Sequence, residues 1–268
     1  MAPIQEFKPP VVETVMGVQF EELPLHLTHY GLFWSAIQNE FPTVEERPKL
    51  QSRVEVKADF PNALWLASKT SEIDVPRIWF AGARTDAGQQ IVQLQSNKLL
   101  QNWRTARDGA DYPSFISNRR DFKNSLDLFV TFVTEREIGW FAAEQCELTY
   151  VNHIPYTGEV WSAACETFDI FSPKLVSDLE SERFSFNQTY WSEQLKGRVH
   201  IVVQPARHKG KIRKVLDFRL TARGAPGTKD VAGVLAWLDE AHKNLLSLFV
   251  RLTRDDNRQK WGISNEFN

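Results

Sequence analysis

The sequence predicts an α+β fold made of two tandem halves, each with the order βαβββα. Strand-like and helix-like segments follow one another in the same order in both halves, and each half ends in a long amphipathic helix. These two helices share six of eight letters, in "KNSLDLFV" at 123–130 and "KNLLSLFV" at 243–250. Ordered similarities of this kind are typical of an internal duplication, although a chance match between common helix letters is the alternative.

The first half is expected to span residues 1–144. "VVETVMGVQFEE" is β-branched and alternating, which predicts a strand, and "LHLTHYGLFWSAIQNEF" has apolar residues at helical spacing up to Pro42. "SRVEVKADF" (52–60) alternates between apolar and charged residues and predicts a half-buried strand. "PRIWFAGARTDAGQQIVQLQ" predicts two further strands around a turn that contains glycine, and "YPSFISNRRDFKNSLDLFVTFVTERE" predicts the long closing helix.

The second half is expected to span residues 145–268. "QCELTYVNHIP" predicts a strand and "GEVWSAACETFDIF" a helix, and both first helices contain "WSA". Three strands follow in "RFSFNQTYWSEQL", "GRVHIVVQ" and "KIRKVLDFRLTARG", the last two joined by a hairpin turn at "ARHKGK". An unbroken apolar stripe predicts the closing helix at 230–254. We expect two antiparallel sheets, each packed by its closing helix, as in a TATA-binding-protein-like or helix-grip-like duplication, an analogy that carries no function.

Composition is that of a globular protein with a rigid core. Hydrophobic residues make up 42% of the chain, which has 18 Phe and 9 Trp, and its net charge is −2. Such a balance gives the whole protein no electrostatic attraction to nucleic acid or to acidic membranes. Cys146 and Cys165 are expected to be buried, reduced thiols. The N-terminus lacks a secretion signal and no apolar stretch is long enough to cross a membrane, so we expect a cytoplasmic protein.

No motif for catalysis stands out, so the sequence predicts no catalytic residue, metal or cofactor and favours a protein that is not an enzyme. His26 and His29 lack the further ligands that a metal site needs and are interpreted as surface or helix-entry residues. His153, near a strand end, is the best candidate for a general base, but a structural role is the favoured interpretation. "HKGKIRK" has no upstream glycine at phosphate-loop spacing and has Ile212 where Ser or Thr would hold magnesium.

The strongest local feature is a cluster of positive charge between Lys196 and Arg223, where nine Lys or Arg accompany a single acid, Asp217. In its last strand Lys211, Arg213, Arg219 and Arg223 have odd numbers, whereas Ile212, Leu216, Phe218 and Leu220 have even numbers, which predicts one basic and one buried face. The candidate binding residues are Arg198, Arg207, Lys209, Lys211, Arg213, Arg219 and Arg223. A basic face of this kind could bind nucleic acid or an acidic protein, and a solvated sheet face is the alternative.

A second, weaker cluster lies in "KLLQNWR" (98–104). Trp103 stands beside Arg104, and an aromatic ring beside a cation is suited to stacking on a base or a ligand ring. A tryptophan that covers a sheet edge is the favoured alternative.

Several motifs along the chain carry a family resemblance. "PPVVETVMGVQFEE", "PRIWF", "IVQLQSNKLLQNWR", "ELTYVNHI" and "KWG" together resemble a sporadically distributed family of uncharacterised bacterial proteins of about this length. The resemblance extends from Pro9 to Gly262 and implies no activity, catalytic residue or cofactor. A patchy distribution hints at antiviral defence or mobile elements.

These observations predict a non-enzymatic binding or adaptor protein that recognises a macromolecular partner, most readily another protein. Nucleic-acid binding through residues 196–223 is the first alternative. A small-ligand-binding protein or enzyme, with a pocket between sheet and helix, is the second. A homo-oligomer is compatible with all three, and no membrane partner is expected.

Overall fold

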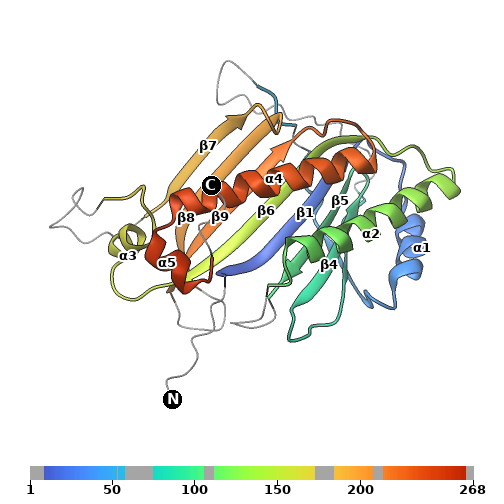
Figure 1. The fold of residues 1–268 in the computed structure, drawn as a ribbon. Coiled ribbons are helices and arrows are strands. Elements are labelled where there is room, and N and C mark those ends of the chain that lie inside the picture. The colour runs from blue at the N-terminus through green and yellow to red at the C-terminus, as the bar shows by residue number, and fades with distance from the viewer. Residues whose placement is uncertain are drawn as a thin grey trace.

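A single antiparallel sheet organises the molecule (Figure 1). The computed structural model describes residues 9–52, 54–57, 75–105, 112–172, 184–207 and 214–263. Within them, nine strands pair in the order β2-β3-β4-β5-β1-β6-β9-β8-β7. The strands are β1 (Val11–Phe20), β2 (Thr43–Arg47), β3 (Arg77–Ala81), β4 (Gln89–Gln95), β5 (Lys98–Arg104), β6 (Ala143–Pro155), β7 (Phe186–Ser192), β8 (Gly197–Arg207) and β9 (Lys214–Gly224).

The expectation of two βαβββα halves with a sheet each, as a TATA-binding-protein-like or helix-grip-like duplication, is wrong, although the class α+β holds. The strands β1 and β6 pair antiparallel along most of their length, from Val11 opposite Asn152 to Phe20 opposite Ala143, and so join all the strands into one sheet. The expected boundary between residues 144 and 145 falls inside β6. Apolar periodicity identifies a strand but not its neighbour, and an open strand edge is satisfied by pairing with another strand.

Two further corrections concern the first strands of the sheet. Residues 54–57 are not a strand, and Val54 and Val56, the expected buried face, are 40% and 46% exposed. Residues 53 and 58–60 of that expected strand lie outside the described residues. Instead, the chain forms β2, whose five residues are all exposed, and the buried strand β5, which the sequence revealed only as a cluster around Trp103.

The helices lie on one face of the sheet, which we call the helix face, and α2 and α4 cross it side by side (Figure 1). The described helices are α1 (Leu27–Ile37), α2 (Phe115–Glu135), α3 (Val160–Thr167), α4 (Val231–Leu252) and α5 (Asp255–Lys260). None of them is long and apolar enough to cross a membrane. Cys146 and Cys165 are buried and free, as expected.

Aromatic rings fill the layer between the sheet and the helices. In α2, Phe129 is fully buried and its ring centroid lies 5.1 Å from that of Phe20 in β1. In α4, Phe249 stacks on Phe218 of β9 at 5.6 Å. Phe129 and Phe249 are corresponding letters of the two similar octapeptides, so both stretches contribute to this layer. Full burial of one such ring is worth about 2 to 3 kcal/mol.

The opposite face, which we call the open face, follows from the strand register, because directly paired residues point to the same side. Residues with odd numbers in β1 from Glu13 to Gln19, in β6 from Gln145 to His153 and in β9, together with their partners on neighbouring strands, belong to it. One row across this face reads Glu45, Trp79, Gln93, Leu100, Gly17, Glu147, Arg223, Arg198 and Trp191. The open face is therefore rich in polar and charged side chains.

Candidate functional site on the open face of the sheet

A stretch of chain without regular structure, residues 48–52 and 54–57, runs over the open face, and we call it the covering segment. Side-chain amides of the sheet hold its backbone. Leu50 exchanges two hydrogen bonds of 3.0 Å with the amide of Gln95, in β4, and the backbone N–H of Glu55 donates to Oε1 of Gln145, in β6, at 2.7 Å. The hydrogen bonds of these glutamine amides take the place of the backbone hydrogen bonds that a strand would form. The segment is therefore held on the sheet without being one of its strands.

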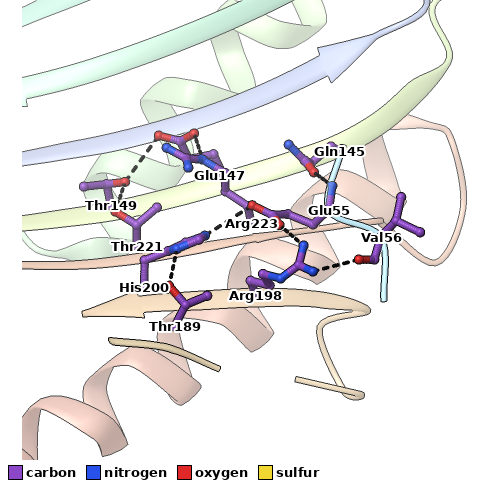
Figure 2. A network of polar contacts seen from close by, with 10 residues as sticks. All are labelled: Glu55, Val56, Gln145, Glu147, Thr149, Thr189, Arg198, His200, Thr221 and Arg223. Carbon is purple, nitrogen blue, oxygen red and sulfur yellow. Dashed lines mark hydrogen bonds and ion pairs between the residues drawn. The ribbon is translucent and has the colours of Figure 1, made fainter. Parts of the chain in front are cut away.

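Glu55 anchors the covering segment to β8 (Figure 2). Its carboxylate forms an ion pair with Arg198 and lies 3.2 Å from Nε2 of His200, while Nη2 of Arg198 also donates to the carbonyl of Val56 at 2.8 Å. Only 10% of the Glu55 side chain is exposed. Burial alone would raise the pKa of this carboxyl, but the hydrogen bonds and charges of His200 and Arg198 outweigh it and lower the pKa to about 2.

A second pair, between β9 and β6, continues the network (Figure 2). Nε of Arg223 lies 2.6 Å from Oε2 of Glu147, and the hydroxyl of Thr149 donates to Oε1 of the same carboxylate at 3.3 Å. The hydroxyls of Thr149 and Thr221 lie 2.8 Å apart. Burial lowers the pKa of Arg223, but the Glu147 carboxylate more than offsets it, so the net shift is upward. Positive and negative groups alternate here, and the network neutralises much of its own charge.

A cavity of about 450 Å³ lies between the covering segment and the sheet. Its lining includes Lys49 and Gln51 from the segment and Gly17, Lys98 and Glu147 from the sheet. A Cβ on Gly17 would lie 2.2 Å from Cδ2 of the neighbouring Leu100, so glycine allows the leucine to lie across β1. A cavity of this size, with cations and a carboxylate, could hold a small polar ligand.

Asp217 forms the centre of another cluster on the open face. Its carboxylate is 2% exposed and lies 2.7 Å from Nη2 of Arg219, while Nε2 of His153 is 4.0 Å away and Gln204 donates to it at 3.3 Å. The hydrogen bond and charge of Asp217 raise the pKa of Arg219. The lone acid of the basic stretch is thus the buried partner of one of its arginines.

The structure brings the predicted binding residues together only in part. Leu216, Phe218 and Leu220 are buried on the helix face, as the alternation in the sequence predicts. On the open face, the arginines 198, 219 and 223 each contact a carboxylate. Arg207 is exposed at the end of β8, and Lys209, Lys211 and Arg213 lie outside the described residues. The pairing carboxylates Glu55 and Glu147 were missed, because they lie far away in the sequence.

Trp103 and Arg104 point to opposite sides of the sheet. Trp103 is 3% exposed on the helix face, where its indole N–H donates to the carbonyl of Ala87 at 2.8 Å, so its ring is not accessible for stacking. On the open face, Arg104 forms an ion pair with Glu13 at 2.7 Å and lies 5.0 Å from the ring centroid of Trp79. An aromatic ring does accompany the cation, but it comes from β3.

His26 and His29 fit structural roles at the start of α1. His26 is the N-cap of α1, and its backbone N–H donates to Nδ1 of His29 at 3.1 Å, as expected for helix-entry residues. The described ranges contain no group of three or more His, Cys, Asp or Glu that could hold a metal ion.

Comparisons of the sequence with models of known protein families and with curated proteins give no match.

Proposed function

We propose that this chain is a non-enzymatic binding or adaptor protein that recognises a macromolecular partner through the open face of its sheet. The observation that carries the proposal is the contrast between the two faces. Helices α2 and α4 cover one face, whereas the other presents rows of polar and charged side chains beside a segment held by glutamine amides (Figures 1 and 2). A sheet face of this kind offers the hydrogen-bonding and charged groups of a protein interface.

A protein partner fits the charge arrangement better than nucleic acid does. The arginines 198, 219 and 223 are each paired with a carboxylate, so the phosphates of a nucleic acid would compete with Glu55, Asp217 and Glu147. Paired charges serve electrostatic complementarity with a protein surface that carries both signs. The family resemblance adds the proposal that the partner belongs to bacterial defence or to a mobile element.

A small polar ligand is the second candidate, and the cavity beneath the covering segment favours it. Its volume of about 450 Å³ falls within the range of ligand pockets. Native mass spectrometry of the protein purified from its host would reveal such a ligand as an added mass that disappears on denaturation.

Co-purification from the native host, with and without nuclease, tests the first proposal. Asn187 and Val202 are paired residues of the open face, whereas Gln188 is exposed on the other side of the same strand. We expect the double variant N187R/V202R to lose the partner that wild type retains after nuclease treatment, and the matched control Q188R to keep it. If wild type loses the partner only on nuclease treatment, the nucleic-acid alternative holds instead. If N187R/V202R and Q188R retain the partner equally, the proposal is wrong.

A further inference from the structure

Three arginines surround a single tryptophan at the far end of the open face from the Glu55 network. The guanidinium carbons of Arg47, Arg77 and Arg104 lie 4.6, 5.5 and 5.0 Å from the ring centroid of Trp79. They come from β2, β3 and β5, and the register places Arg47 directly opposite Arg77. Three cations are therefore gathered at one indole ring by strands that are separate in the sequence.

The carboxylates around this cluster do not neutralise it. Arg104 pairs with Glu13 at 2.7 Å, and Arg47 pairs with its neighbour Glu45. The third guanidinium, of Arg77, donates from Nη1 to the neutral amide oxygen of Gln93 at 2.7 Å and has no carboxylate partner among the described residues. Among the described residues, three positive charges thus meet two negative ones, and one positive charge is left over.

Two hydrogen-bond donors at the centre of the cluster have no acceptor among the residues that the structure describes. Nε of Arg77 and the indole Nε1 of Trp79 are both buried, and neither finds an acceptor within the described part of the chain. Burial, together with the charges of Arg47 and Arg104, lowers the pKa of Arg77. Because an unpaired buried donor is unfavourable, an anion that accepts from these groups would be stabilised there.

We propose that Arg47, Arg77 and Arg104 around Trp79 form a subsite for a phosphoryl group on a side chain of the protein partner. This proposal rests on the proposed function. A phosphorylated side chain carries nearly two negative charges and three acceptor oxygens, and arginine forks match such oxygens better than any other side chain does. The guanidinium groups already lie against the indole ring, so the ring positions them and does not stack on a base.

The test is a titration of the full chain, labelled with fluorotryptophan, with inorganic phosphate at constant ionic strength. The ¹⁹F resonance of Trp79 is assigned from the spectrum of W79F. Phosphate, but not chloride, is expected to shift this resonance, and R77Q should weaken the apparent affinity by about tenfold or more. R77K keeps the positive charge but loses the two-pronged guanidinium, so its apparent affinity for phosphate should lie between those of wild type and R77Q. The matched control is R136Q, because Arg136 lies 5.4 Å from the ring of Phe132, at the end of α2.

Several results would overturn the proposal. The subsite is ruled out if phosphate does not shift the Trp79 resonance. It is also ruled out if R77Q is folded by circular dichroism and binds phosphate as tightly as wild type does. Acetate binding as tightly as phosphate would reassign it to carboxylates. If adenosine monophosphate binds more tightly than a phosphoserine peptide, the phosphoryl group belongs to a nucleotide. That result would contradict the proposal that a side chain of the protein partner carries it. None of these readouts involves N187R/V202R, so the subsite and the proposed function fail independently.

Discussion

At the scale of single residues, Glu55 is a charged anchor of the covering segment on the sheet. Its carboxylate contacts Arg198 and His200, and its backbone N–H is held by Gln145. E55Q removes the charge while keeping the shape, and we expect it to lower the free energy of unfolding by about 1 to 3 kcal/mol at neutral pH. Urea denaturation measures the change. E193Q is the matched control, because the Glu193–Lys57 pair joins the same segment to the end of β7 but is exposed on both sides and should contribute little.

The same residue predicts a pH dependence of stability. The pKa of the Glu55 carboxyl is about 2 in the folded protein, against an ordinary value of 4.5 that applies on unfolding. Because the folded carboxyl is the weaker proton acceptor, its stabilising contribution is complete above the unfolded pKa and is lost as the pH falls from there toward 2. The difference between wild type and E55Q should therefore shrink between pH values of about 5 and 3, and a constant difference would contradict the role given to this carboxylate.

How far the sequence predicted the site also becomes clear at this scale. Alternation in β9 correctly placed Arg219 and Arg223 on the face opposite to the buried Leu216, Phe218 and Leu220. The carboxylates that face Arg198 and Arg223 come from the covering segment and β6, and local periodicity does not specify which residues of neighbouring strands are paired. For the same reason, the ring beside Arg104 proved to be Trp79 and not its sequence neighbour Trp103.

At the scale of elements, the turn between β3 and β4 fixes the position of Trp103. Gly88 has φ of +108°, and a Cβ there would lie 2.4 Å from Nε1 of Trp103 and 2.5 Å from the carbonyl oxygen of Arg104. We expect G88A to destabilise the protein by about 2 to 4 kcal/mol, because both the backbone conformation and the close approach exclude a side chain. The control is G31A in the exposed middle of α1, where a Cβ meets nothing within 4 Å. Alanine should stabilise that helix by about 0.5 to 1 kcal/mol in the same denaturation assay.

Most elements were predictable, and two of the exceptions, β2 and residues 54–57, show what alternation does not report. The long helices α2 and α4 follow from apolar stripes, and β1, β6 and β9 from alternation. The strand β2 was missed because all its residues are exposed, and residues 54–57 were mistaken for a strand because their alternation is equally clear. Alternation of apolar and polar residues shows that a segment suits a sheet. Whether its backbone pairs with another strand depends on residues elsewhere in the chain.

At the scale of the whole molecule, the pairing of β1 with β6 joins the strands of the two expected halves into one sheet. Separation of the two expected halves would expose the ladder from Val11 opposite Asn152 to Phe20 opposite Ala143. We therefore predict a single cooperative unfolding transition, with coincident urea curves from tryptophan fluorescence and far-ultraviolet circular dichroism. Two separated transitions would indicate halves that fold independently.

The assignment of the open face to partner binding is tested most directly by photo-crosslinking at neighbouring positions of the two edge strands. Glu45 and Asn187 point to the open face, whereas Glu46 and Gln188, the next residues, point to the helix face, and all four are exposed. A photoreactive amino acid is placed at each position in turn, and the protein is irradiated with its co-purified partner. We expect crosslinks from position 45, 187 or both and none from 46 or 188, and capture from 46 or 188 alone would contradict the assignment.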